Sequence, residues 1–329
     1  MAKYKVFLTR RIPQPAIDFI EENNIELEIN PENRVLTHEE ILNGVKGKDA
    51  LICLLTDKID GEIMDIAGKN LKIIANYAVG YNNIDVKAAT ERGIPVTNTP
   101  GVLTETTADL TMALLLSISR RIVESDKYTR EGKFKGWGPM LHLGSDIHGK
   151  TIGIIGCGRI GTAVAKRAAK GFKMKVLYNS INKKKEIEEE LGGEYCTIEE
   201  MCERADYITL HVPLTEKTKY LFGEKEFEAM KETAYLINTS RGEVVNEEAL
   251  VRALKEKKIA GAALDVYEKE PIVHPELKKL DNVIITAHIG TATIETRTEM
   301  GMMAARNLVA VLKGQKPPNC VNQEVYERK

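Results

Sequence analysis

The sequence predicts an α/β protein with two domains, each built around a parallel β-sheet. Short β-branched runs alternate with charged segments of helical periodicity along the whole chain, a pattern typical of βαβ units whose sheets are covered by helices on both faces. The chain has 329 residues, which is more than one compact core usually holds. A glycine-rich turn, Gly156–Gly161, follows an apolar run and opens a helical segment.

The first third of the chain contains the first set of strands. We predict strands at Lys5–Thr9, Ala50–Leu55, Lys72–Asn76 and Pro95–Asn98, with helical periodicity at Pro13–Glu22 and Ile84–Arg92 between them. A longer helical pattern then runs from about Thr104, a candidate N-cap, to Arg130. Its length predicts one continuous helix that connects the two domains.

A second alternation of strands and helices begins at Thr151. We predict helices at Arg159–Lys170 and Thr293–Lys313, the second ended by Gly314 and the pair Pro317-Pro318. The predicted strands are Thr151–Gly156, Lys175–Asn179, Tyr207–Val212, Ala234–Thr239, Ala260–Val266 and Val283–Thr286. Two α/β domains therefore account for the chain.

The composition excludes several classes of function. The net charge of -1 gives no electrostatic basis for binding nucleic acid, and the longest apolar stretch, about Leu110–Ile118, is too short to span a membrane. The N-terminal segment lacks the apolar region of a signal peptide. The 5 cysteines are scattered without a C-x-x-C pair, so we expect no disulfide framework, no metal site and a cytoplasmic location.

The glycine-rich turn has the pattern that binds the pyrophosphate of a dinucleotide. In Gly156-Cys157-Gly158-Arg159-Ile160-Gly161, the first glycine permits a tight strand-to-helix turn and the second lets the backbone approach a pyrophosphate, while the third lets the helix pack closely on the strand. The anion is then held by unpaired amides at the helix N-terminus. Because the strand and the helix are both readable, the motif predicts a Rossmann-like domain.

The end of the following strand bears on the choice between NAD and NADP. NAD-specific domains generally place an acidic residue about 20 residues after the first glycine, on the ribose hydroxyls. Here the strand ends in Asn179-Ser180 and is followed by Lys183, Lys184 and Lys185. Without a carboxylate to repel a 2′-phosphate, and with lysines nearby, NADP(H) is favoured and NAD(H) is the alternative. In the alternative interpretation these lysines are only solvated surface charges.

Three polar side chains follow strands of the second half, at positions suited to reducing a 2-keto acid. They are Arg241, Glu270 and His288, and ligands of open α/β sheets bind at the carboxyl ends of strands. A guanidinium can bind the substrate carboxylate and polarise the keto group. A histidine can donate a proton near neutral pH, and a carboxylate beside it favours the protonated ring.

Several segments together resemble the D-isomer-specific 2-hydroxyacid dehydrogenase family, and within it the glyoxylate/hydroxypyruvate reductases. The resemblance covers nearly the whole chain and implies that Arg241 binds substrate, Glu270 pairs with the histidine, and His288 is the acid/base. It also implies that Asp265 holds the nicotinamide carboxamide. The segments that carry it are Gly156–Gly161, Leu210–Thr215, Asn238–Gly242, Leu264–Pro271 and His288–Gly290.

The resemblance also implies a set of binding residues. For the substrate these are Arg241 and His288, the backbone of Val79 and Gly80, and Trp137, which would either line the pocket of a partner subunit or pack at the subunit interface. The cofactor residues implied are Gly156, Gly158, Arg159, Ile160, Gly161, Asn179, Ser180, Ile181, Asn182, Val212, Pro213, Thr239, Ser240, Arg241, Asp265, His288, Ile289 and Gly290.

The family further implies two Rossmann-like or flavodoxin-like domains, one inserted into the other. Residues 1–98 and 288–329 would form the substrate domain, and residues 99–287 the dinucleotide domain, in a homodimer. The expected reaction is the NAD(P)H-dependent reduction of glyoxylate and/or hydroxypyruvate with His288 as the proton donor. D-lactate or 3-phosphoglycerate dehydrogenase is the alternative, and a corepressor-like dinucleotide sensor is the alternative from another class. Formate dehydrogenases carry glutamine in place of Glu270, which argues against that branch.

Overall fold

The computed structural model describes residues 3–327. It contains two compact units, Met1–Leu103 with Thr291–Lys329, and Thr104–Gly290, so the second unit is inserted in the sequence of the first. The sequence-based boundaries differ at both joins, because residues 99–103 belong to the first unit and residues 288–290 to the second. The predicted ranges 1–98 and 288–329 also include residues 1–2 and 328–329, which lie outside the described residues.

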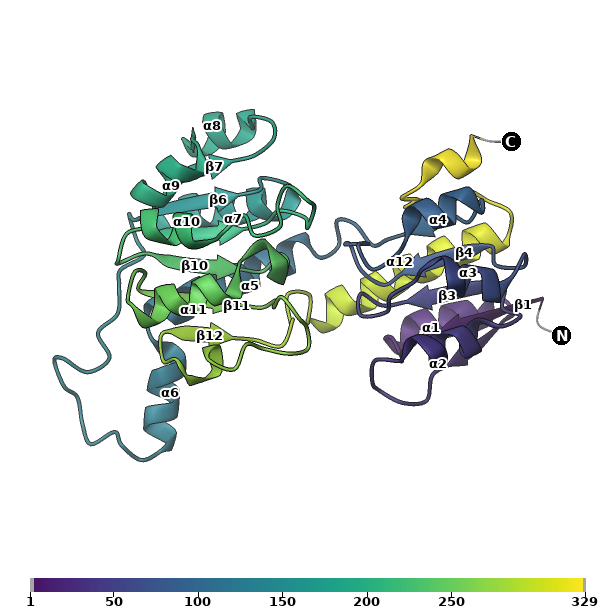
Figure 1. The fold of residues 1–329 in the computed structure, drawn as a ribbon, viewed down its shortest axis with the longest axis horizontal. Helices are drawn as coiled ribbons and strands as arrows, with labels where there is room; N and C mark the ends of the chain where they lie inside the picture. Colours follow the sequence, from purple (N-terminus) through teal and green to yellow (C-terminus); the bar gives the residue numbers. More distant parts are fainter. Residues whose placement is uncertain (1–2, 328–329) are drawn as a thin grey trace. The chain divides into compact units, whose positions relative to one another are not determined.

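The first unit is a parallel sheet in the order β2-β1-β3-β4-β5. Its helices flank the sheet. Helix α12, which follows the second unit in the sequence but belongs to the first, packs against α1 and β4 (Figure 1). The strands are β1 (Tyr4–Leu8), β2 (Ile25–Ile29), β3 (Ala50–Cys53), β4 (Ile73–Asn76) and β5 (Val96–Thr97), and the helices are α1 (Gln14–Glu22), α2 (His38–Val45), α3 (Gly61–Ala67), α4 (Val86–Glu91) and α12 (Ile294–Leu312).

Strand β2 is one that the sequence did not predict. It lies at the edge of the sheet and pairs only with β1, and its residues Glu26 and Glu28 alternate with apolar ones. An edge strand with one solvated face has a weak sequence signal because it needs few buried residues. The four-residue strands β3 and β4 are fully buried, and the sequence predicted both.

The second unit is a larger parallel sheet in the order β12-β11-β10-β9-β6-β7-β8. The strand order reverses at β6, which pairs with β9 on one side and β7 on the other. The strands are β6 (Thr151–Ile155), β7 (Lys175–Asn179), β8 (Glu194–Tyr195), β9 (Tyr207–Leu210), β10 (Tyr235–Asn238), β11 (Gly261–Leu264) and β12 (Val283–Ile285), and the helices are α5 (Thr104–Ser119), α6 (Ile122–Arg130), α7 (Arg159–Phe172), α8 (Lys185–Leu191), α9 (Ile198–Arg204), α10 (Glu224–Ala229) and α11 (Glu247–Lys255). The predicted α/β class with two parallel sheets is confirmed.

The predicted helix from Thr104 to Arg130 is wrong in one respect, because it is broken into α5 and α6. Arg121 adopts a left-handed conformation with φ of 52°, which an α-helix of L-residues does not continue through. The freed carbonyl of Ser119 accepts a hydrogen bond from the amide of Ser145 at 2.9 Å. Helix α6 buries none of its residues and projects from the body of its unit (Figure 1). Thr104 is already the first helical residue of α5.

Apart from α6, the helices bury an apolar face against the sheets. Helix α7 covers the second sheet with its buried face of Ala163, Val164, Ala165 and Ala168. Between residues 3 and 327, no helix combines the length and the apolar character that crossing a bilayer requires.

Candidate active site

The predicted site residues of the second unit follow the carboxyl ends of neighbouring strands. Arg241 comes after β10, Glu270 after β11 and His288 after β12, and these strands are adjacent and parallel in the sheet. Their carboxyl ends therefore lie at one edge. The glycine-rich turn follows β6 at the same edge, where the strand order reverses, and such switch points are where open α/β sheets bind ligands.

The glycine-rich turn has the geometry that its sequence predicts. Gly156 has φ of +94°, and a Cβ there would lie 2.7 Å from the backbone of His211. A Cβ on Gly161 would lie 2.2 Å from the carbonyl oxygen of Gly156, so only glycine allows α7 to start this close to β6. By contrast, nothing lies within 4 Å of a Cβ built on Gly158, the N-cap of α7, which has no side-chain cap. The backbone at Gly158 is therefore open to an approaching anion, beside the N-terminal amides of α7, which have no acceptor within their own helix.

Other predicted cofactor segments lie against or near this turn. Val212 approaches Gly156, since its Cγ1 atom would be 2.8 Å from a Cβ on that glycine, and Pro213 follows it. Asn179 ends β7, and its side-chain amide donates to the carbonyl of Cys196 at 2.8 Å. The next side chain but one, Ile181, is fully exposed, and Ser180 and Asn182 flank it. These segments therefore follow β9 and β7, the two strands that pair with β6 where the strand order reverses.

Two buried polar atoms at these segments lack hydrogen-bond partners, and they bear on whether a dinucleotide fits. The imidazole Nε2 of His211, beside Gly156, and the hydroxyl of Thr107, beside Gly290, are buried without a hydrogen-bond partner in the described residues. Buried polar atoms in native proteins nearly always have partners, and a polar ligand bound at this edge would supply the partners that these two atoms lack. Burial lowers the pKa of His211 to about 3, which keeps the ring neutral near pH 7 and excludes it as a proton donor.

Arg241 is held by the turn that precedes it. The side chain of Asn238 donates to the carbonyl of Arg241 at 2.9 Å and accepts from the amide and hydroxyl of Ser240 at 3.0 and 2.8 Å. Thr239 forms a hydroxyl hydrogen bond with Thr111 at 2.9 Å. The Arg241 guanidinium donates to the carbonyl of Ser240 at 2.6 Å. Burial lowers its pKa, and the charge of Glu270 acts in the opposite direction, so a desolvated guanidinium lies within the field of this carboxylate.

His288 and Glu270 form a direct pair. The Nδ1 atom of His288 lies 2.8 Å from Glu270 Oε2, and the other carboxylate oxygen of Glu270 accepts from the amide of Tyr267 at 3.2 Å. Both side chains are a little over one quarter exposed, at 29% and 28%. The Nε2 atom of His288 makes no hydrogen bond to any described residue. The carboxylate therefore orients the ring, while the second nitrogen is available to a ligand.

Asp265 holds the loop that carries His288. Its Oδ1 atom accepts from the hydroxyl of Thr286 at 2.6 Å and the amide of Ile289 at 2.8 Å, and its Oδ2 atom accepts from the amide of Gly290 at 2.8 Å. His288 lies between these anchors with φ of 52°, a strained conformation for a non-glycine residue. The resemblance implied only a contact with nicotinamide, whereas these bonds already use three of the roughly four acceptor positions of a carboxylate.

The loop with Val79 and Gly80 belongs to the first unit. It follows β4, and the carbonyls of both residues accept side-chain hydrogen bonds. Val79 accepts from Asn98 at 2.8 Å, and Gly80 accepts from Asn76 at 2.7 Å. The amides of Val79 and Gly80 donate no hydrogen bond within residues 3–327. The hydrogen bonds to the carbonyls hold the backbone in place, and the two adjacent amides remain available as donors. Such a pair of amides can bind a carboxylate.

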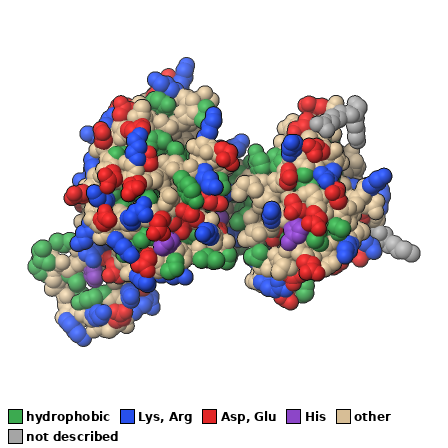
Figure 2. All heavy atoms as spheres, viewed as in Figure 1, with side chains coloured by type: hydrophobic (Ala, Val, Ile, Leu, Met, Phe, Trp, Pro, Cys, Tyr) green, Lys and Arg blue, Asp and Glu red, His purple; other side chains and the backbone are tan. Residues whose placement is uncertain are grey.

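Trp137 lies apart from these contacts, in the irregular segment after α6. Its side chain is 85% exposed, so its own chain does not bury it. Figure 2 shows apolar side chains gathered on this projecting segment. The exposed apolar residues of α6 and the segment after it are Ile122, Val123, Phe134, Trp137, Met140, Leu141 and Leu143.

Sequence reasoning missed the residues that hold the site in place. Asn76, Asn98 and Asn238 each follow or end a strand and fix a loop backbone through the side-chain amide. The available signal was their position, because asparagine at a strand end commonly bonds to nearby backbone. Thr107, on α5, gave no signal at all, since its relevance depends on the packing of that helix beside Gly290.

The fold and this edge define a dinucleotide-binding oxidoreductase of the α/β class. A family model described as D-isomer specific 2-hydroxyacid dehydrogenase, NAD binding domain, matches residues 112–290. The chain belongs to the D-isomer-specific 2-hydroxyacid dehydrogenase family. The sequence-based expectation of an enzyme of this family that reduces a 2-keto acid is confirmed.

Individual relatives are similar along their full length. A glyoxylate reductase of Korarchaeum cryptofilum is 53% identical over 327 residues, covering 99% of this chain and 98% of the relative. The TT0316 protein of Thermus thermophilus superposes with a TM-score of 0.90 at 46% identity, covering 96% and 99% of the two chains. An NADPH-dependent glyoxylate/hydroxypyruvate reductase of Sinorhizobium meliloti, in complex with NADP and malonate, gives a TM-score of 0.84 at 32% identity over 97% of each chain.

Proposed function

We propose that this enzyme reduces glyoxylate and/or hydroxypyruvate with NADPH, in the cytoplasm. The observation that carries the chemistry is the His288–Glu270 pair at 2.8 Å on the strand edge that also holds Arg241 and the glycine-rich turn. The substrate class is supported by similarity to proteins named as glyoxylate reductases. The 5 cysteines are free thiols, which agrees with a reducing compartment.

The proposed mechanism assigns one task to each group. The free amides of Val79 and Gly80 receive the substrate carboxylate, and the guanidinium of Arg241 binds the carboxylate and polarises the keto group. When bound, the reduced nicotinamide supplies the hydride. The alkoxide that forms takes the proton from His288 Nε2, and Glu270 stabilises the charged ring before the transfer. Asp265 anchors the His288 loop and keeps one acceptor position for the carboxamide.

The cofactor contacts follow the same edge. We assign the pyrophosphate to the amides at Gly158–Gly161, the ribose end to Asn179–Asn182, and the nicotinamide end to the backbone near Thr239 and Ile289. The open space at Gly158 and the orphaned atoms of His211 and Thr107 support this placement.

A substrate panel tests the proposed function. Purified enzyme is given glyoxylate, hydroxypyruvate, pyruvate and 3-phosphohydroxypyruvate with NADPH and with NADH, and kcat/KM is measured for each pair. We expect the highest values for glyoxylate or hydroxypyruvate. A preference for pyruvate would instead support a D-lactate dehydrogenase, and a preference for the phosphorylated acid would support a 3-phosphoglycerate dehydrogenase. No turnover with any of them would support a dinucleotide sensor.

The charge of Glu270 is predicted to set the pH range of the reductive reaction. Replacing Glu270 by Gln keeps a hydrogen-bond acceptor near His288 but removes the negative charge that favours the imidazolium. We expect the pH above which reductive kcat falls to move down, because the variant lacks the negative charge beside the ring. The measurement is kcat against pH for wild type and variant. Superimposable profiles would show that Glu270 does not act through its charge on His288.

The cofactor preference is predicted from the end of β7. Lys183 lies over the ring of Tyr195, with its ammonium 5.5 Å from the ring centre, and neither Lys184 nor Lys185 forms an ion pair within the described chain. These cations remain available to a 2′-phosphate. We expect kcat/KM for NADPH to exceed that for NADH by about ten-fold, or ~1.4 kcal/mol.

The matching variant is Ser180→Asp, which adds a carboxylate without removing a hydrogen bond. We expect it to lower kcat/KM for NADPH by about ten-fold through charge repulsion and to leave NADH nearly unchanged. If wild type strongly prefers NADH, the lysines are solvated surface charges and the NADPH assignment is wrong.

A homodimer is predicted from the exposed apolar segment after α6. Sedimentation should give twice the mass of the 36.7 kDa chain, because the exposed apolar side chains that gather on this segment, Trp137 and Met140 among them at 85% and 76% exposed, favour a protein interface. Trp137→Ala separates two roles. A dimer with raised KM for glyoxylate means that Trp137 lines the partner's pocket, and loss of the dimer means that it packs at the interface. A monomeric wild type would contradict both.

A further inference from the structure

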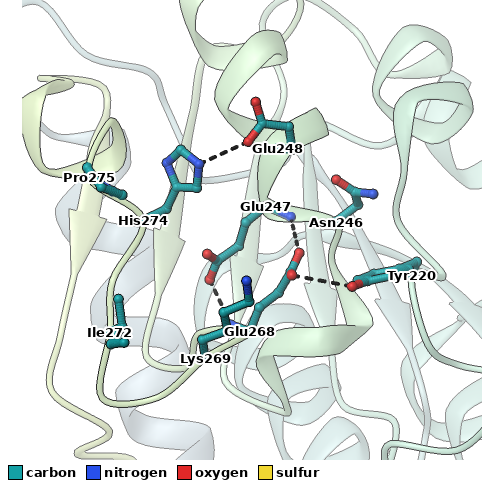
Figure 3. A pocket seen from close by; sticks show the side chains of 9 residues that line it. All are labelled: Tyr220, Asn246, Glu247, Glu248, Glu268, Lys269, Ile272, His274 and Pro275. Atoms are coloured by element: carbon teal, nitrogen blue, oxygen red, sulfur yellow. Dashed lines mark hydrogen bonds and ion pairs between the residues drawn. The ribbon is translucent and has the colours of Figure 1, made fainter.

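A pair of glutamates outside the catalytic set joins helix α11 to the loop that carries Glu270. The carboxylate of Glu268 accepts a hydrogen bond from the amide of Glu247 at 2.6 Å, and the carboxylate of Glu247 accepts from the amide of Glu268 at 2.8 Å. Figure 3 shows the two side chains crossing between the start of α11 and the loop. Each glutamate therefore binds the backbone of the other.

The surroundings show that this contact is built into the fold. Glu247 is only 7% exposed, an unusual burial for a glutamate. The second carboxylate oxygen of Glu268 accepts from the hydroxyl of Tyr220 at 3.4 Å. The charged groups that face Glu247 are Glu268, Lys269 and His274, and His274 is paired with Glu248 at 3.0 Å. Losing this hydrogen bond would leave a buried carboxylate without a partner, which would cost free energy of folding.

The same loop is fixed a second time, at the turn that carries Arg241. A Cβ on Gly242 would lie 1.8 Å from the carbonyl carbon of Tyr267 and 2.4 Å from the amide nitrogen of Glu268. The backbone after Arg241 is thus in direct contact with the backbone that precedes Glu270. The loop then closes on itself, since the amide of Ile272 donates to the carbonyl of Lys269 at 2.7 Å.

We propose that Glu247 and Glu268 are positioning residues, which form a reciprocal clasp that holds the Glu270 loop so that its carboxylate reaches His288. This inference rests on the proposed function, because it assumes that Glu270 acts on His288 during reduction. Glu270 is two positions beyond the clasped amide, and its own anchor is the longer bond to the Tyr267 amide at 3.2 Å. The clasp therefore fixes the backbone close to Glu270, next to the Gly242 contact.

The reciprocal geometry predicts a specific pattern in a double-mutant cycle. Glu247→Ala and Glu268→Ala should each lower reductive kcat with glyoxylate by about ten-fold or more, because displacement of a catalytic group by about 1 Å can cost up to 100-fold. Each single variant removes one of the two hydrogen bonds and leaves the other. If the two bonds hold the loop only together, losing either one already releases it, so the double variant should be little worse than either single variant; independent, additive losses would contradict a reciprocal clasp. KM for glyoxylate should change less than kcat, because Arg241 and the Val79–Gly80 loop keep their own anchors.

A second readout separates positioning from stability. If the clasp places Glu270, the pH above which kcat falls should move down in Glu247→Ala as it does in Glu270→Gln. Glu247→Gln keeps an acceptor oxygen and should restore both kcat and the pH profile to nearly wild-type behaviour. The control is Glu200→Ala, which removes an exposed glutamate at the start of α9, where Glu200 accepts a local capping hydrogen bond from the Thr197 amide at 2.8 Å. It should lower Tm without changing the pH profile.

The outcomes distinguish the clasp from the proposed function. If Glu270→Gln shifts the pH profile and Glu247→Ala changes only Tm, the clasp inference is overturned and the proposed function stands. If wild type does not reduce 2-keto acids, both are overturned. If it does, but Glu270→Gln leaves the profile unchanged, the clasp inference loses its basis and the proposed reaction stands. If Glu247→Ala does not fold, Glu247→Asp, with a carboxylate one methylene shorter, gives the same comparison.

Discussion

Replacing His288 by Asn is expected to lower reductive kcat by about 10²–10⁴-fold, the usual contribution of a positioned general acid. Asparagine fills similar space and can keep a hydrogen bond to Glu270, which now lies 2.8 Å from Nδ1. It has no group that gives up a proton near neutral pH, so the alkoxide would have to take its proton from water. The measurement is the rate of NADPH oxidation with saturating glyoxylate.

The control for this variant is a histidine–carboxylate pair elsewhere in the chain. His38 lies 3.0 Å from Asp60 in the first unit, at nearly the same separation as the His288–Glu270 pair. His38→Asn should leave kcat within about two-fold of wild type, as surface substitutions generally do. If His288→Asn also stayed within that range, His288 would not be the proton donor. The KM for NADPH should change far less than kcat, because the glycine-rich turn and the other cofactor residues are untouched.

Replacing Arg241 by Lys is expected to lower kcat/KM for glyoxylate by about 10²–10³-fold, although the positive charge is kept. A single ammonium cannot reproduce the planar fork that binds a carboxylate and polarises a keto oxygen together. The loss should appear in both kcat and KM, because the guanidinium acts on the bound substrate and on the transition state. Steady-state kinetics over a range of glyoxylate concentrations measures both constants.

The matched control is Arg252→Lys. Arg252 lies on α11 in the same unit and forms a surface ion pair with Glu224 at 3.8 Å, so its replacement should leave kcat/KM nearly unchanged. Catalytic efficiency close to wild type in Arg241→Lys would contradict direct substrate binding by the guanidinium. A loss confined to KM would show that Arg241 binds the carboxylate without assisting the reaction.

Much of the fold could be predicted because its signals are local. Strands such as β6 and β10 are runs of apolar residues buried on both faces, and such runs identify themselves in a sequence. The strands that were missed, β2 and β8, lie at the edges of the two sheets, where little burial is required. The break at Arg121 was missed as well, because the hydrogen bond from Ser145 to Ser119 joins segments that no periodicity connects.

For the site, the sequence by itself determined the phosphate turn and the types of the reacting groups. The tasks of Gly156 and Gly161 depend on neighbours a few residues away, so a motif can encode them. Only the tertiary structure decided that His288 lies 2.8 Å from Glu270 and that Asp265 anchors its loop. It also decided that Glu247 clasps Glu268. These contacts join side chains and backbone that meet only when parallel strands bring their carboxyl ends to one edge, and that arrangement is a property of the whole sheet.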